Sequence, residues 1–284
     1  MLRLRVLTAV VGLPIVGFIF WSQNKWLILL LFTVCATLCS FESLAMLLGR
    51  QVDVTDEAPH PNLKRFIIEN PKPFIALLIA VLVLGAQIVT SLQPGVFYAI
   101  LVALLASSML MAVKPQDIFN VSSTLVFSLV YGAMPWAAIW MLYRDQPGVA
   151  GIVFVLAVIW SGDTGAYFGG SYLGKHKLAP SLSPKKTWEG ALFGLLSSMV
   201  AAILVNAIFG GILGSLLTVA IAGCVGGIFG QLGDLFESSI KRSCNVKDSG
   251  KIFPGHGGLL DRVDGLLFAG PVIWVILYGL SGIG

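Results

Sequence analysis

The chain has 284 residues, of which 57% are hydrophobic and only 11% are charged, and its mean hydropathy is +0.90. A soluble domain carries roughly 25% charged residues, so the composition excludes a water-soluble fold for most of the chain. The net charge of +4 is small, and basic residues are not interleaved with aromatic ones on a polar face, which argues against a nucleic-acid partner.

Nine apolar runs, each near the length of about 20 residues that crosses a bilayer, predict an all-α fold. We expect a polytopic transmembrane helical bundle in which residues 1–284 form a single integral membrane domain. The helices are expected at about residues 6–22, 26–48, 74–90, 95–113, 121–142, 149–169, 189–209, 212–233 and 264–281. The first run follows Arg3 and Arg5, as in a cleaved signal peptide, but no clean small-residue cleavage site comes after it, so we expect a retained span.

The basic residues predict the orientation of these spans. All but two of the 18 basic residues, Lys25 and Arg144, fall on one side when the N-terminus is cytoplasmic. Because cytoplasmic segments are enriched in Lys and Arg, nine spans predict a cytoplasmic N-terminus and an outside C-terminus. The compact loops favour a bacterial inner membrane. Residues 49–73, rich in proline and acids, are expected to form a flexible loop.

An acidic residue lies deep in the sixth apolar run, in the segment Trp-Ser-Gly-Asp-Thr-Gly-Ala-Tyr. We expect this residue, Asp163, to face a polar cavity, since a carboxylate in a span is costly elsewhere. A secondary transporter or ion pump would instead use Asp163, Glu42 and Asp234 as a carboxylate relay. Glu42 would either line the cavity or hydrogen-bond to a neighbouring helix, and we favour this second, structural role.

The seventh helix is preceded by Ser-Pro-Lys-Lys-Thr-Trp-Glu-Gly. We expect Ser183 to cap this helix, with Pro184 at its first position. A helix N-terminus beside Lys185 and Lys186 would bind an anion. The plainer alternative is a positive-inside anchor with Trp188 at the membrane interface.

Two pairs of acids flank a loop between the last two helices. Asp234, Glu237 and Lys241 share one face if the preceding helix continues, and Asp261 and Asp264 are three residues apart. Carboxylate ligands without cysteine suit a hard cation such as Mg²⁺. The alternative is that each acid pairs with a nearby base, as Glu237 could with Lys241. The four cysteines form no CxxC pair or Cys/His cluster, which argues against a zinc or redox site.

The loop between these acid pairs contains four glycines and nearby bases. Backbone N–H groups at glycines approach anions closely, so the loop predicts a phosphate site, with a plain tight turn as the alternative. His256 alone is better explained as a structural residue. Small residues in the eighth run predict close helix packing and a dimer contact: Gly223, Gly226, Gly227 and Gly230.

Residues 238–264 resemble the signature of the phosphatidate cytidylyltransferase family, also called CDP-diacylglycerol synthases. The two motifs around Asp163 and Lys185 are similar to other motifs of that family, so the matching segments lie within residues 160–264. The signature positions are Ser238, Ile240, Lys241, Arg242, Lys247, Asp248, Gly250, Phe253, Pro254, His256, Gly257, Gly258, Leu259, Asp261, Arg262, Val263 and Asp264.

The resemblance implies a homodimer that uses Mg²⁺ and converts CTP and phosphatidic acid to CDP-diacylglycerol and pyrophosphate. The metal ligands are then Asp234, Asp261 and Asp264, with Glu237 and Asp163 as further candidates. Besides these three aspartates, Lys241 is assigned to catalysis. Substrate binding is assigned to Lys185, Lys186, Arg242, Lys247, His256, Gly257, Gly258 and Arg262, with Gly255 in the same loop. A prenyl- or sugar-phosphate transferase, which also pairs acids with Mg²⁺, is a further alternative.

Overall fold

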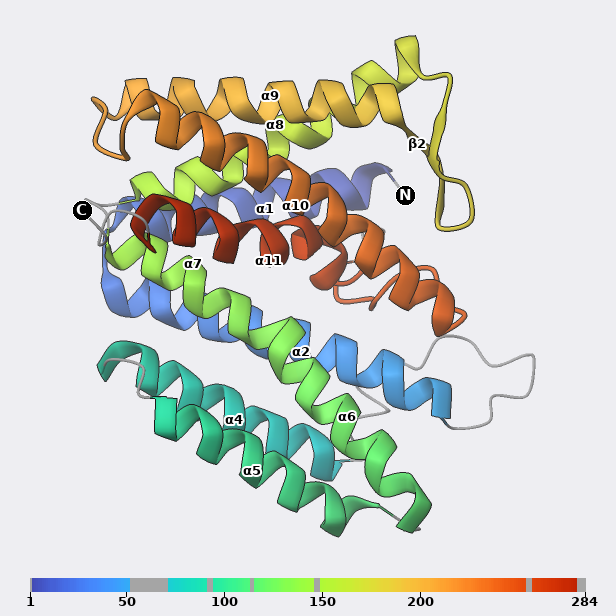
Figure 1. Ribbon diagram of the computed structural model, residues 1–284. Helices are drawn as coiled ribbons and strands as arrows, with labels where there is room; N and C mark the ends of the chain where they lie inside the picture. The colour runs from blue at the N-terminus through green and yellow to red at the C-terminus, as the bar shows by residue number, and fades with distance from the viewer. Residues whose placement is uncertain are drawn as a thin grey trace. The chain divides into compact units, whose positions relative to one another are not determined.

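The computed structural model describes residues 2–51, 71–90, 94–112, 115–145, 149–253 and 257–279 (Figure 1). The chain divides into two compact units. The first unit is Met1–Ala137 with Ser243–Arg262, and the second is Ala138–Arg242 with Val263–Gly284. Most of the predicted loop 49–73 lies outside the described residues, and its role stays a prediction.

The first unit is built from helices that pack around α2. Its helical segments are α1 (Leu2–Trp21), α2 (Lys25–Gln51), α4 (Pro71–Thr90), α5 (Pro94–Met111), the short 3₁₀ turn η1 (Pro115–Asp117), α6 (Ile118–Ser128) and the π-helical η2 (Leu129–Ala133). Helix α2 packs on α4 and on η2, and α4 packs on α5 (Figure 1). A Cβ atom at Gly132 would lie 2.6 Å from the Ser40 Cα, so glycine is what lets η2 approach α2.

The second unit begins within α7 (Met134–Arg144), which continues η2 without a break. It contains α8 (Ala150–Leu173), α9 (Trp188–Ile208), α10 (Leu216–Ser243), α11 (Leu260–Trp274) and the π-helical η3 (Val275–Gly279). Helices α10 and α11 each extend a short way into the first unit. Strands β1 (Lys177–Ala179) and β2 (Ser183–Thr187) form an antiparallel hairpin before α9, with Lys177 opposite Thr187.

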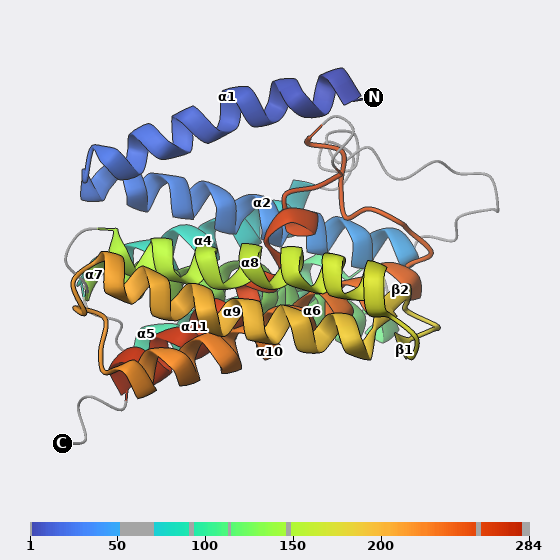
Figure 2. The same ribbon diagram turned by 90° about the horizontal axis from the view of Figure 1, so that it is seen from above.

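Small residues hold α8 and α9 together along their length. Figures 1 and 2 both show the two helices side by side. A Cβ atom at Gly194 would lie 2.7 Å from the Gly162 carbonyl oxygen, so the backbones are too close for a larger residue there. The Ser198 hydroxyl donates to the Val158 carbonyl oxygen at 2.7 Å, which satisfies a buried polar group between the helices.

The predicted glycines of the eighth run pack inside the second unit. A side chain at Gly223 or Gly227 would meet α9 at Ser198, and one at Gly226 would meet Ile273 of α11. The prediction of close helix packing is confirmed. Because neighbouring helices of the same chain cover these positions, they do not form the surface of a dimer contact.

An all-α membrane protein is supported by the lengths and composition of the helices. Within the described ranges, five helical segments are long and apolar enough to cross a membrane: Lys25–Gly49, Ile118–Arg144, Ala150–Leu173, Trp188–Ile208 and Leu216–Ser243. Each predicted apolar run contains helix. Nine crossings and the orientation of the termini stay predictions. Cys35 and Cys39 lie in α2, where Cys39 is buried and Cys35 is half-buried.

The predicted range 189–209 of the seventh helix agrees with α9, but the predicted cap at Ser183 was wrong. Residues 183–187 form strand β2, and α9 begins only at Trp188. The helix is capped by Thr187, whose Oγ1 accepts a hydrogen bond from the Gly190 N–H at 3.2 Å, and not by Ser183. Pairing with β1 holds Ser183 and the two lysines in extended backbone, so Lys185 and Lys186 are strand residues.

Candidate active site

Four predicted acids belong to the second unit, where three helices bring them near one another. Asp163 comes from α8, Asp234 and Glu237 from α10, and Asp264 from α11. Helix α10 continues past residue 233 to Ser243, so the predicted shared face of Asp234 and Glu237 is confirmed. Asp234 is close enough to both Asp163 and Asp264 for its charge to act on each of them.

Two lysines neutralise part of this acidic group. The Lys186 Nζ atom on β2 lies 2.6 Å from Asp234 Oδ2, and the Lys241 Nζ atom donates to Glu237 Oε2 at 2.7 Å. Glu237 is 1% exposed, so its pairing with Lys241 compensates a buried charge. The side chains of Glu237 and Asp264 are also close enough to interact.

Glycines at the crossing of α10 and α11 explain why Asp234 and Asp264 are neighbours. A Cβ atom at Gly233 would lie 2.5 Å from the Asp264 carbonyl oxygen, and one at Gly265 would lie 3.2 Å from the Gly230 carbonyl oxygen. The helices therefore approach through backbone contacts. This close approach places the residue after Gly233 beside the residue before Gly265.

The donor set suits a metal that takes further ligands from its substrate. Within the described part of the chain, no group of three or more His, Cys, Asp or Glu side chains is arranged to hold a metal ion by itself. Mg²⁺ is commonly bound by one or two carboxylates, with water and substrate phosphates completing its octahedron. Asp234 and Asp264 fit that pattern, because the two acids lie close enough for their charges to act on each other.

Asp261 belongs to the first unit, where it organises the loop before α11. Its Oδ2 atom accepts hydrogen bonds from the Ser249 N–H at 2.8 Å, the Ser249 hydroxyl at 2.9 Å and the Gly258 N–H at 2.8 Å. Asp261 and Asp264 lie one turn apart on α11, as predicted. A role for Asp261 as a metal ligand stays a prediction.

The glycines of this loop make room for carboxyl groups of the chain itself. Gly257 has φ +83°, which favours glycine, and a Cβ atom there would lie 2.5 Å from Asp261 Oδ2. Side chains at Gly250 or Gly258 would overlap the carboxyl group of Glu42. Since the Gly258 N–H already donates to Asp261, it is engaged inside the loop. Phosphate binding by Gly257 and Gly258 stays a prediction.

The remaining predicted site residues are divided between the two units. Lys185, Arg242, Lys247 and Arg262 are exposed. Lys185 and Arg242 belong to the second unit, and Lys247 and Arg262 to the first. Gly255 and His256 lie outside the described residues.

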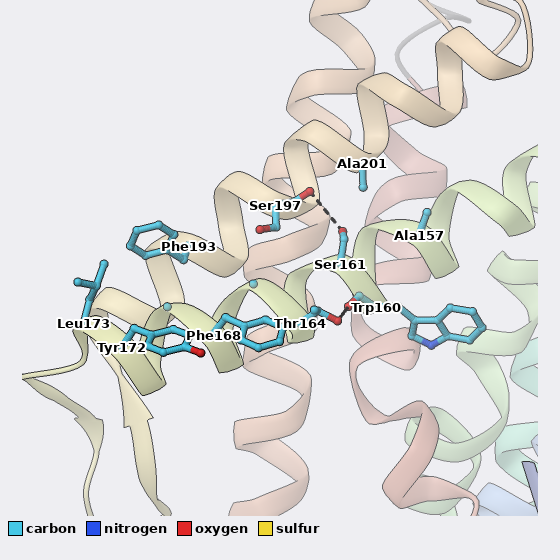
Figure 3. Close-up of a pocket in the computed structure, with 12 residues that line it drawn as sticks. Ala157, Trp160, Ser161, Thr164, Phe168, Tyr172, Leu173, Phe193, Ser197 and Ala201 are labelled. Atoms are coloured by element: carbon cyan, nitrogen blue, oxygen red, sulfur yellow. Dashed lines mark hydrogen bonds between the residues drawn. The ribbon is translucent and has the colours of Figure 1, made fainter. Parts of the chain in front are cut away.

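A groove of about 780 Å³ runs along the seam between α8 and α9 (Figure 3). Figure 3 shows Trp160, Phe168 and Tyr172 following one side of α8, with Phe193 on α9. Most residues that line the groove are apolar, and the Ser161 hydroxyl is satisfied by backbone carbonyl oxygens. Among the described residues, none of the predicted site residues lines the groove, and its position between two apolar spans suits contact with hydrocarbon.

Sequence reasoning missed two polar residues, Ser249 of the first unit and Glu189 of the second. Ser249 hydrogen-bonds Asp261, and Glu189 accepts hydrogen bonds from the N–H groups of Lys175 and His176 at 3.1 and 3.2 Å, which holds the hairpin to α9. Glu189 was visible as an acid in a first helical turn. Nothing local marks Ser249, because its partners come from distant parts of the chain.

Comparison with known proteins gives consistent matches. A sequence model described as the cytidylyltransferase family matches residues 3–280. A phosphatidate cytidylyltransferase of Brucella suis biovar 1 (strain 1330) is 42% identical over 148 residues, 52% of this chain and 54% of the relative. That of Bacillus subtilis (strain 168) is 45% identical over 133 residues, 47% and 49% of the two chains. That of Staphylococcus saprophyticus is 45% identical over 137 residues, 48% and 52%. The chain thus spans about half the length of the curated relatives it matches.

Proposed function

We propose that this chain, which belongs to the cytidylyltransferase family, transfers the cytidylyl group of CTP to phosphatidic acid, forming CDP-diacylglycerol and pyrophosphate. The observation that carries the proposal is the group formed by Asp234, Asp264 and Lys186, two acids and a base from three separate elements. The name that its relatives carry, phosphatidate cytidylyltransferase, supports the choice of substrates.

The reaction joins two anions at one phosphorus atom. A phosphate oxygen of phosphatidic acid attacks the α-phosphorus of CTP, and the bond from that phosphorus to the pyrophosphate oxygen breaks. Transfers of this kind depend mainly on positioning and on neutralising charge. The enzyme therefore needs cations close to both phosphates and a place where a membrane lipid meets a soluble nucleotide. A group of acids and lysines carried by apolar helices suits both needs.

Mg²⁺ is the cofactor we propose, held by Asp234 and Asp264 with Asp261, Glu237 and Asp163 as further candidate ligands. When bound, it would supply Lewis-acid neutralisation of phosphate charge. Lys186 and Lys241 already lie beside carboxylates of this group. We propose that they turn to phosphate oxygens when substrate binds, with help from Lys185, Arg242, Lys247 and Arg262, the loop glycines and His256.

The alternative functions receive no support from the comparisons. The family model is that of cytidylyltransferases, and the relatives are named for that activity. Neither match favours a secondary transporter, an ion pump or a prenyl- or sugar-phosphate transferase. Acidic residues could serve each of these functions, so the functions are distinguished by which nucleotide and which acceptor the protein uses.

We further propose a homodimer in the bacterial inner membrane, with nine spans, a cytoplasmic N-terminus and the active site facing the cytoplasm. The distribution of basic residues and the bacterial relatives support this placement. Membrane fractionation is expected to recover the protein with the inner membrane, and native mass measurement in detergent should give twice the 30.3 kDa of one chain. A monomer mass at all detergent concentrations would contradict the dimer.

The activity has a direct test. Purified protein incubated with α-labelled CTP and phosphatidic acid should form labelled CDP-diacylglycerol and release pyrophosphate in equal amounts. Chelation of divalent cations should stop the reaction, and added Mg²⁺ should restore it. Diacylglycerol, which lacks the attacking phosphate, is the matched control acceptor and should give no product. Turnover only with another nucleotide or another acceptor would refute the proposed substrates.

A further inference from the structure

We infer that Glu42 is a positioning residue, which fixes the first turn of α11 and with it Asp261 and Asp264. The inference rests on the proposed function for the roles of these two aspartates. Its structural part, that a glutamate of the second predicted span holds the loop before the last helix, stands independently of the reaction.

Glu42 supplies the cap that the first turn of α11 lacks locally. Its carboxyl group is fully buried on α2 within the first unit. Oε1 accepts a hydrogen bond from the Leu259 N–H at 3.0 Å, and Oε2 accepts one from the Leu260 N–H at 2.8 Å. The first N–H groups of a helix have no partner inside the helix and usually bond to a neighbouring Ser, Thr, Asp or Asn. Here the acceptor lies 218 positions earlier in the chain.

Ser249 connects Glu42 to Asp261. The Ser249 hydroxyl lies 3.1 Å from Glu42 Oε2 and 2.9 Å from Asp261 Oδ2. A hydroxyl has one proton, so it serves one of these carboxylates at a time. Both carboxylates therefore depend on the same loop, which also has glycine at the two positions where a side chain would overlap Glu42. The loop is built around this carboxyl group.

Disturbing the first turn of α11 would move the candidate site residues that follow. A helix rises about 1.5 Å per residue, so Asp264 is only about 4.5 Å along the axis from Asp261. A misplacement of about 1 Å at a reacting centre can cost about 10²-fold in rate. We therefore expect Glu42 to affect turnover without touching substrate.

Glu42→Gln tests the inference in the full-length protein. The substitution replaces a carboxylate oxygen by an NH₂ group, which sets a donor against a backbone N–H donor. Hydrogen–deuterium exchange should become faster in peptides covering residues 249–260 and stay unchanged in α9. Loss of a hydrogen-bond partner that orients a metal ligand typically lowers metal affinity or activity about tenfold or more. We therefore expect kcat to fall about tenfold, while KM for CTP changes less.

Two variants complete the design. Ser43→Ala is the matched control, because Ser43 is a buried neighbour on α2 whose hydroxyl donates to the Ser40 carbonyl oxygen of its own helix. Its exchange and kcat should equal those of the unmodified protein. Ser249→Ala should speed exchange in the same peptides and lower kcat. In the double variant with Glu42→Gln, kcat should fall by less than the product of the two separate fold-changes, because both residues act through one loop.

The outcomes separate the parts of the inference. If Glu42→Gln unfolds the protein, Ser249→Ala decides whether the loop positions the site. Unchanged loop exchange in the folded variants would refute the capping role. Faster loop exchange with unchanged kcat would refute positioning. Failure of the unmodified protein to form CDP-diacylglycerol would instead refute the proposed function and leave the exchange result valid.

Discussion

Asp264→Asn is expected to abolish turnover while the protein stays folded in the membrane. The asparagine Oδ1 atom can still accept the hydrogen bond that Asp264 Oδ1 receives from the Gly265 N–H at 2.8 Å. Its NH₂ group has nearly the size of the carboxylate oxygen that it replaces, so the packing around the side chain is kept. The local structure therefore survives, whereas the anionic oxygen that would bind Mg²⁺ is lost.

The size of this effect follows from the charge that the metal neutralises. A bound cation is worth several kcal/mol in the transition state, and about 4 kcal/mol corresponds to a fall in kcat of about 10³-fold. The measurement is the initial rate of CDP-diacylglycerol formation at saturating CTP, with thermal unfolding measured in parallel. Asp117→Asn is the control, since Asp117 makes no side-chain capping hydrogen bond and lies outside the site. Near-normal turnover in Asp264→Asn would remove Asp264 from the metal site.

Lys186→Met is expected to lower kcat/KM for CTP and to reduce the Mg²⁺ concentration needed for half-maximal rate. Methionine keeps the length of the apolar stem but removes the ammonium group that lies 2.6 Å from Asp234 Oδ2. Asp234 then has no competing cation from β2, so it should bind Mg²⁺ more tightly. The substrate phosphate loses a charged hydrogen-bond donor. Such a bond is worth about 1.5–3 kcal/mol, which corresponds to a fall in kcat/KM of about 10- to 100-fold.

The opposite directions of these two changes make the test specific. A merely structural lysine would not lower the Mg²⁺ requirement. Lys177→Met is the matched control, because Lys177 is an exposed lysine on the paired strand β1, opposite Thr187. It should leave both quantities unchanged. An unaltered kcat/KM in Lys186→Met would exclude Lys186 from substrate binding, and a raised Mg²⁺ requirement would contradict its competition for Asp234.

Local features of the site were predictable from the sequence. The spacing of Asp234, Glu237 and Lys241 repeats with the period of a helix, and α10 does carry all three. The Glu237–Lys241 ion pair follows from the same period, because residues four apart are neighbours on a helix. These relations need only one element to be identified correctly.

The hairpin shows where such local prediction fails. Ser183 followed by Pro184 has the composition of a helix start, yet both residues belong to β2. A short strand is stabilised by its partner, and β1 is too short to be recognised from its own residues. As a result, Lys186 reaches Asp234 from a strand and not from a helix N-terminus.

The sequence by itself determined the membrane class, the family and the helical faces that carry acids, because composition and short-range spacing are local properties. The tertiary structure decided which faces meet. Gly233 lets α11 approach α10, β2 carries Lys186 to Asp234, and Glu42 caps a helix far along the chain. Contacts of this kind depend on the packing of separate elements, and no spacing within one element encodes them.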